Sequence, residues 1–255
     1  MKNHFILTPF FLDQSLPGLE SLAEPGWSLN KPVLPKGVPQ SRMSLLHEVI
    51  ASKVTETVQA GKRPVSIAGD CCSTIGVVAG LQRAGINPFV IWFYAHGDFN
   101  TWETTPSGFL GGMALAMLAG LGEQTMPENV GLQSVPEEMI ILTDGRNLDL
   151  QERDLIKGSK VEHLTDVTEL LEYPLPNLPL YIHVDADIIN PIDAPAMSYL
   201  APGGPRASEL EHVFSFLSGT GQIAAVSACT WTPELDVDKQ SEAVSMKLLQ
   251  VLLES

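Results

Sequence analysis

Imidazole and carboxylate side chains stand at alternate positions in two short segments of the chain. In FYAHGDFN, His96 and Asp98 are two residues apart. In HVDADIINP, the same spacing separates Asp185 from Asp187. Alternate residues of a β-strand point to one face of the sheet. Carboxylates gathered in one place repel each other unless a cation neutralises them, so these four residues predict a site for manganese, iron or zinc.

Both segments continue apolar runs that are typical of buried strands. One run begins at Phe89 and leads to His96, and the other runs from Leu180 to Val184 and leads to Asp185. Strand-like and helix-like segments alternate along the chain, which predicts an α/β fold with a parallel sheet covered by helices on both faces. Ligands of such sheets bind beside the carboxyl ends of the strands. We therefore expect the polar residues to meet at that edge.

The remaining elements are predicted from hydrophobic spacing and from glycine and proline breaks. The expected strands are 5–7 (an edge strand), 65–68, 89–96, 139–142, 161–164, 180–184 and 222–229. The expected helices are 41–60, 73–84, 109–121, a segment ending near 157, 166–172, 209–217 and 238–253. Residues 13–40 and 122–138 are expected to be loops. No linker or repeat divides the chain, so residues 1–255 are expected to form one domain.

Composition excludes several classes of partner. The 255 residues carry a formal charge of −15, which disfavours nucleic acid and anionic membrane surfaces because both attract basic proteins. No apolar run is long enough to predict a membrane span. The three cysteines, two of them adjacent, make no disulfide framework, so a reducing cytoplasm is expected.

Six segments carry a resemblance to a known superfamily. They are AGDCCSTIG, FYAHGDFNT, TTPSGFLGGM, GRNLDLQE, HVDADIINP and CTWTPELD. In order and spacing they resemble GGDHS, DAHxDxN, TxSGxxHG, RDxDxxE, DxDxxDP and VExNP of the ureohydrolases, the superfamily of arginase, agmatinase and formiminoglutamase. The resemblance implies a three-layer α/β/α sandwich, often a trimer or hexamer, that hydrolyses a guanidino or related C–N bond with a metal-bridging hydroxide.

The resemblance also implies roles for residues that are retained. His96, Asp98, Asp185 and Asp187 match metal ligands, and we assign catalysis to His96 and Asp98. Asn100, Thr105 and Ser107 match positions that contact the amino-acid end of the substrate, and Asp149 matches a carboxylate that binds its α-amino group. His183 lies on the site-facing side of its strand, and its role stays open.

Other family positions are altered. Cys71 stands for the first metal-ligand histidine, Tyr94 for the aspartate that bridges both metals, and Gly111 for the active-site histidine. Thr230 stands for the glutamate that helps to hold the guanidinium, and remains a candidate for contact with the substrate. Asn190 stands for the aspartate of DxDxxDP.

These substitutions limit the metal content that we expect. Tyr94 cannot easily replace a bridging carboxylate, since a phenol stays protonated near neutral pH. We therefore expect one divalent ion (manganese, zinc or iron) or none. One ion could lie between His96, Asp185 and Asp187. Another could lie between Cys71, Asp98 and Asp185, where a thiolate would favour zinc or iron over manganese.

Three functions follow from this pattern. The first is a metal-dependent hydrolase of a linear guanidino or formimino C–N bond, with a modified substrate favoured over plain arginine. The second is a non-catalytic member that keeps the fold for binding or assembly. The third is metal-free chemistry at Cys71, whose pKa a helix N-terminus would lower and whose thiolate would lie near His96.

Overall fold

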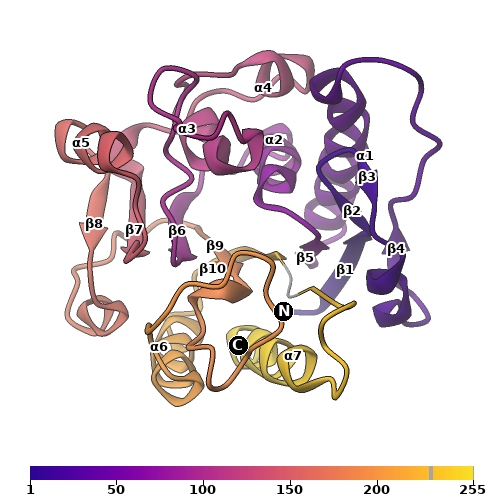
Figure 1. The fold of residues 1–255 in the computed structure, drawn as a ribbon. Coiled ribbons are helices and arrows are strands. Elements are labelled where there is room, and N and C mark those ends of the chain that lie inside the picture. The colour runs from indigo at the N-terminus through magenta and orange to yellow at the C-terminus, as the bar shows by residue number, and fades with distance from the viewer. Residues whose placement is uncertain (230–231, 255) are drawn as a thin grey trace.

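The computed structural model describes residues 1–229 and 232–254, and in this part of the chain one parallel sheet of eight strands organises the molecule (Figure 1). The spatial order is β4-β1-β5-β10-β9-β6-β7-β8, and every pairing is parallel. Its strands are β1 (Asn3–Thr8), β4 (Ser28–Leu29), β5 (Arg63–Ala68), β6 (Phe89–Tyr94), β7 (Ile140–Asp144), β8 (Glu162–Leu164), β9 (Leu180–Asp185) and β10 (Ile223–Cys229). A separate hairpin pairs β2 (Phe10–Phe11) with β3 (Gln14–Ser15).

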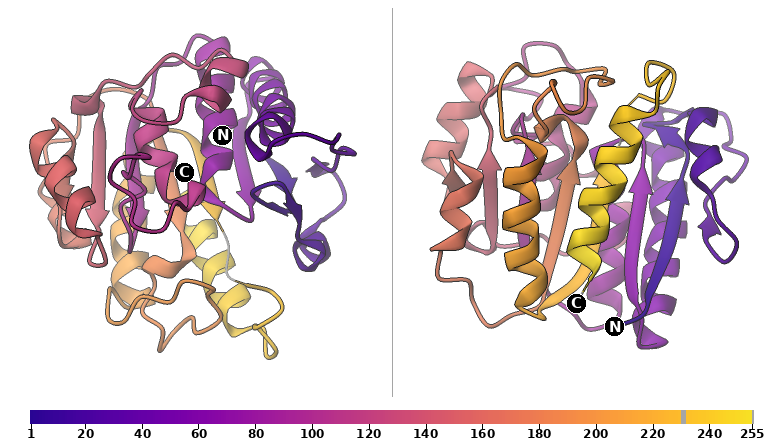
Figure 2. Two further views of the ribbon diagram at one scale, coloured as in Figure 1. Left: turned by 45° about the horizontal axis from the view of Figure 1, so that its top comes forward. Right: turned by 90° about the horizontal axis from the view of Figure 1, so that it is seen from below.

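Helices cover both faces of the sheet, and this confirms the predicted α/β/α sandwich (Figure 2). One face carries α1 (Pro39–Gln59), α2 (Thr74–Arg83), α3 (Ala114–Leu118), α4 (Thr125–Asn129) and α5 (Leu150–Gly158). The other face carries α6 (Ala207–Gly219) and α7 (Gln240–Leu253). Among the described residues, no helix combines the length and the apolar character that crossing a bilayer requires.

The apolar strands are uninterrupted because the sheet is buried on both sides. In β6, Trp92 belongs to the apolar cluster under α1 and α2, whereas its neighbour Phe93 packs in the cluster under α6 and α7. Parallel sheets that are covered on both faces have such continuous apolar runs. The four central strands β5, β10, β9 and β6 consequently end side by side, which brings together loops that lie far apart in the sequence.

Local structure differs from the sequence expectations in several places. The expected helix 109–121 is broken, since a 3₁₀ turn over Leu110–Met113 with a non-helical Gly112 precedes the short α3. Segment 13–40 is not structureless: β4 pairs with β1, so β1 is not the edge strand. Asn30 holds this segment by donating to Oγ1 of Thr8 and to the carbonyl of Leu46. Helix α4 lies in the expected loop 122–138, and residues 167–171 form a 3₁₀ helix.

Candidate metal centre and active site

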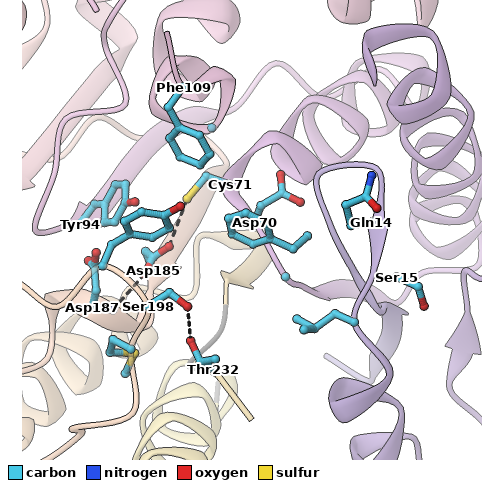
Figure 3. A pocket seen from close by; sticks show the side chains of 16 residues that line it. Gln14, Ser15, Asp70, Cys71, Tyr94, Phe109, Asp185, Asp187, Ser198 and Thr232 are labelled. Atoms are coloured by element: carbon cyan, nitrogen blue, oxygen red, sulfur yellow. Dashed lines mark hydrogen bonds between the residues drawn. The ribbon is translucent and has the colours of Figure 1, made fainter. Parts of the chain in front are cut away.

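The carboxyl ends of β5, β10 and β9 bring a thiol and a carboxylate together. Cys71 lies in the 3₁₀ turn that follows β5, and Asp70 caps this turn by accepting a hydrogen bond from the amide of Cys72 at 2.9 Å. The register places Cys229 of β10 opposite Asp185 of β9. As a result, the Cys71 thiol donates to Oδ2 of Asp185 over 3.2 Å (Figure 3).

Three carboxyl groups of the predicted site are placed close enough to raise one another's pKa. Asp98 and Asp187 are 2% and 5% exposed, and Asp185 faces a cavity. Burial raises the pKa of Asp98 well above its ordinary value, and the charges of Asp185 and Asp187 add to this. Burial and the charge of Asp187 raise the pKa of Asp185 to about 8. The three carboxyl groups therefore lie within electrostatic range of one another.

Asp98 is held in an uncommon backbone conformation. Its φ of 49° lies in the left-handed region, which aspartate tolerates better than most residues. The amides of Leu115 and Ala116 donate to its carbonyl oxygen at 2.9 and 3.0 Å. Its Oδ2 atom is buried and has no hydrogen-bond partner among the described residues. A buried carboxylate oxygen without a partner is costly unless a ligand or an ion completes it.

His96 is paired with Asp187. Its Nδ1 lies 2.8 Å from Oδ2 of Asp187, which is an ion-pair distance. Its Nε2 lies 3.0 Å from the side-chain amide of Asn147, which fixes the ring. Burial alone would lower the pKa of His96, but the carboxylates of Asp187 and Asp185 outweigh burial and raise it.

The donor set fits one ion held by nitrogen and oxygen. Nδ1 of His96 and Oδ2 of Asp187 are 2.8 Å apart, close enough to be two ligands of one ion, and Asp185 supplies a third donor beside them. Tyr94 does not fit a bridging role. Burial and the neighbouring charge of Asp98 raise the pKa of its phenol well above 10, so it stays neutral. A pair of ions bridged as in the ureohydrolases therefore does not fit these residues.

Aromatic side chains divide the cleft into two cavities. The aromatic wall consists of Tyr94, Phe109 and Tyr199, which line both cavities. The ring centroids of Phe109 and Tyr199 are 5.4 Å apart. The first cavity, of about 310 Å³, contains Cys71 and Asp185 (Figure 3). The second, of about 260 Å³, contains the residues predicted to contact substrate.

The altered position Gly111 lies directly beside this aromatic wall. A Cβ atom at Gly111 would lie 2.5 Å from the ring of Phe109, so a histidine here requires the ring to move. The ring of Phe109 therefore takes space beside the position where the ureohydrolases carry their active-site histidine.

The predicted substrate contacts share the second cavity, except for one residue. Asn100, Thr105, Ser107 and Asp149 all line it. Asn100 donates to Oδ2 of Asp149 at 2.9 Å, and Asp149 begins α5. The hydroxyls of Thr105 and Ser107 are 3.4 Å apart and partly exposed. Thr230 lies outside the residues that the structure describes.

Comparisons with known proteins agree with this fold. A family model described as the arginase family matches residues 31–254. This chain belongs to the arginase family. An arginase of Bacillus subtilis is 31% identical over 219 residues, which cover 81% of this chain and 74% of that protein. An N(omega)-hydroxy-L-arginine amidinohydrolase of Streptomyces lavendulae is 26% identical over 229 residues, covering 89% and 78%. The crystal structure of Bacillus subtilis arginase matches with a TM-score of 0.84 at 25% identity, covering 100% of this chain and 99% of that one.

Two polar residues of this arginase-family site were missed by the sequence analysis. Asn147 stands where the segment RDxDxxE has its first acidic letter, so comparison with that motif could have found it. Glu152 matches the last letter of the same motif and is 2% exposed. It accepts hydrogen bonds from the amides of Phe99 and Asp149 at 2.9 and 3.1 Å, which ties the loop after β6 to the start of α5.

The surroundings of Cys71 in this arginase-family chain oppose the lowered thiol pKa that was expected from the sequence. Burial raises the pKa of Cys71 well above its ordinary value, and Asp98 and Asp185 add to the effect. The imidazole hydrogen-bonded to its thiol is that of His183, with Nε2 at 3.3 Å from Sγ. Burial lowers the pKa of His183 to about 3, so this ring is neutral. The pair therefore remains a thiol and a neutral imidazole near neutral pH.

Proposed function

We propose that this protein is a metal-dependent hydrolase of a linear C–N bond in a guanidino or formimino compound. One divalent ion is held by His96, Asp185 and Asp187. The observation that carries this proposal is the convergence of Nδ1 of His96 and Oδ2 of Asp187, which are 2.8 Å apart, with the carboxylate of Asp185 beside them. The printed activities of the relatives, arginase and N(omega)-hydroxy-L-arginine amidinohydrolase, support the guanidino class.

The protein's own groups divide the remaining work. A bound divalent ion lowers the pKa of a coordinated water toward neutrality and so supplies a nucleophile. Asp98 lines the second cavity, and its Oδ2 has no partner among the described residues. In this proposal, Oδ2 takes the proton of the attacking water and passes it to the leaving nitrogen. Asn147 holds the His96 ring, so that Nδ1 stays directed at the ion.

The second cavity is the proposed place of the substrate. Asn100, Thr105 and Ser107 offer amide and hydroxyl groups, and Asp149 offers a carboxylate that can pair with an α-amino group. The positions that would hold an unmodified guanidinium are altered, and the ring of Phe109 lies beside Gly111. A modified guanidino or a formimino group is therefore favoured over plain arginine.

The aromatic wall favours a second candidate function. Because Tyr94, Phe109 and Tyr199 line both cavities, the wall could keep substrate from the ion, and the fold would then serve binding or assembly without turnover. Metal-free catalysis by Cys71 has no such support, since the pKa of its thiol is raised. Assembly as a trimer or hexamer and a cytoplasmic location stay predictions from the sequence.

The experiment loads purified protein with manganese, zinc or iron and measures release of urea, hydroxyurea, ammonia or formamide from guanidino, N-hydroxyguanidino and formimino compounds. We expect turnover that is lost in His96→Ala and Asp187→Asn. His212→Ala is the matched control, because this histidine is exposed on α6. If every metal-loaded form is inactive while His96 and Asp187 still bind an ion, the non-catalytic function replaces this proposal.

A further inference from the structure

Three buried side chains lie together beside the first cavity. The proposed function does not use them as a group. The Sγ atoms of Cys71 and Cys229 and a ring nitrogen of His183 all lie within 4.8 Å of one another. We propose that Cys71, His183 and Cys229 form a binding site for a soft divalent ion, zinc in the first place. This site goes beyond the proposed hydrolase, whose ion is held by His96, Asp185 and Asp187.

The sheet order creates this cluster. β10 lies between β5 and β9, so Cys229 is directly opposite Ala68 on one side and Asp185 on the other. Cys71 follows β5 after a short turn, and its side chain comes back over the end of β10. His183 lies two residues before Asp185 on β9, on the same face of the strand. The three donors therefore come from β9, from β10 and from the turn after β5, which are neighbours at one edge of the sheet.

His183 is oriented as metal-ligating histidines are. Its Nδ1 lies 2.8 Å from Oγ of Ser227, and that hydroxyl is 2.6 Å from the hydroxyl of Tyr181. The ring of Trp92 packs against the imidazole with centroids 3.9 Å apart. When Nδ1–H donates to Ser227, the lone pair of Nε2 faces the thiol of Cys71 at 3.3 Å. A ligating histidine that hydrogen-bonds through its other ring nitrogen has a fixed tautomer and orientation.

A fourth donor and an entry path are also present. Oδ2 of Asp185 lies 3.2 Å from Sγ of Cys71, and its Oδ1 accepts from the amide of Asp187 at 2.9 Å. Asp185 and Cys71 both line the cavity of about 310 Å³, so an ion can reach them from the surface. Two sulfurs, one nitrogen and one oxygen are the donor types that zinc prefers and manganese does not. Asp185 is shared with the proposed hydrolytic ion, so the two sites are adjacent and the sulfur ligands distinguish them.

The test measures metal binding with reduced, full-length protein that has first been stripped with a chelator. Zinc is titrated against a chromophoric chelator, and cobalt is followed by its absorption spectrum. We expect a zinc ion with two sulfur neighbours at about 2.3 Å in X-ray absorption, and a thiolate-to-cobalt charge-transfer band. Zinc affinity should fall about 100-fold or more in Cys229→Ser and in His183→Gln, because each removes a direct ligand.

Cys72→Ser is the matched control. Cys72 is a buried thiol beside Cys71, but its sulfur faces the carbonyl of Leu110, so this variant should bind zinc like the unaltered protein. Circular dichroism of each metal-free variant checks that it folds, and X-ray absorption of the unaltered protein needs no variant. The inference is overturned if Cys229→Ser binds zinc as tightly as the unaltered protein, or if bound zinc has no sulfur neighbour.

Separate measurements distinguish the zinc site from the metal ion of the proposed hydrolase. An ion held by His96, Asp185 and Asp187 has no sulfur ligand, so it gives cobalt no thiolate band. His96→Ala should abolish turnover and leave that band unchanged. Cys229→Ser should remove the band and leave an ion at His96.

Discussion

The crowded carboxyl groups predict how the stability of the metal-free protein depends on pH. The pKa of Asp185 is raised to about 8 in the folded protein, mainly by burial and by Asp187. Unfolded, the same group has its ordinary pKa of about 3.9. Between these values the folded state binds one more proton than the unfolded state, so stability decreases as pH rises. A divalent ion removes this penalty, because it favours the charged carboxylates.

In the interval from pH 6.5 to 8 this effect is opposed by a smaller one from two buried histidines. Burial lowers the pKa values of His47 and His183 to about 3, so both rings are neutral in the folded protein, whereas each is half protonated at pH 6.5 in the unfolded chain; together they raise stability by about 0.8 kcal/mol as pH rises to 8. One extra proton bound by the folded state makes the free energy of unfolding fall by about 1.4 kcal/mol per pH unit. This slope becomes smaller as pH approaches the pKa of Asp185. Asp185 alone therefore costs the metal-free protein about 1.5 kcal/mol over the interval. The raised pKa of His96 adds a decrease of the same sign.

The assay is urea unfolding of chelator-treated protein at pH 6.5, 7.2 and 8. We expect the free energy of unfolding to decrease with pH, and Asp185→Asn to make the decrease smaller. Protein loaded with zinc or manganese should show the opposite trend, since protons compete with the ion for its ligands. If metal-free protein is equally stable at both ends of the interval, the carboxyl groups are not crowded as described here.

Further substitutions test individual contacts. Tyr94→Asp combined with Cys71→His should raise the manganese stoichiometry by one ion per chain, because the bridging carboxylate and a nitrogen ligand return. Elemental analysis measures the stoichiometry. An unchanged value contradicts the matching of these strands to the family. Gly97→Ala should destabilise the protein by about 1–3 kcal/mol, because a Cβ atom there would lie 2.6 Å from Oε1 of Glu152. Thermal unfolding measures the loss of stability. Gly158→Ala is the control, because a Cβ atom at that position has no neighbour within 4 Å.

The ends of the apolar runs were enough to predict where the carboxylates lie, but not the thiol and imidazole cluster beside them. The parity expected within each pair is wrong, because β6 ends at Tyr94, before His96 and Asp98, and Asp187 lies in the 3₁₀ turn after β9. Cys229 meets Cys71 only because β10 is inserted between β5 and β9, an order that local patterns do not encode. Neighbours across a sheet of non-sequential order are separated by most of the chain, so only the folded topology reveals them.

The expected helix over 109–121 failed for a related reason. Its apolar spacing is helical, but Gly111 and Gly112 weaken a helix at the point where the chain must bend around the site. The resulting 3₁₀ turn lets the amide of Asn100 donate to the carbonyl of Gly112 at 3.2 Å. It also lets the Phe109 ring lie beside Gly111. Tertiary packing around the site thus overrides the local pattern.

The substitutions in this site change its donor chemistry in one direction. Where the ureohydrolases have a bridging aspartate, Tyr94 offers a neutral phenol, and where they have a histidine ligand, Cys71 offers sulfur. Both changes weaken a site for two hard, oxygen-preferring ions. His183 and Cys229 add a neutral imidazole and a second sulfur within 4.8 Å of Cys71, which strengthens a site for one softer ion. Together, the two altered positions and the two neighbouring donors favour one softer ion over two hard ones, which is what the proposed zinc site requires.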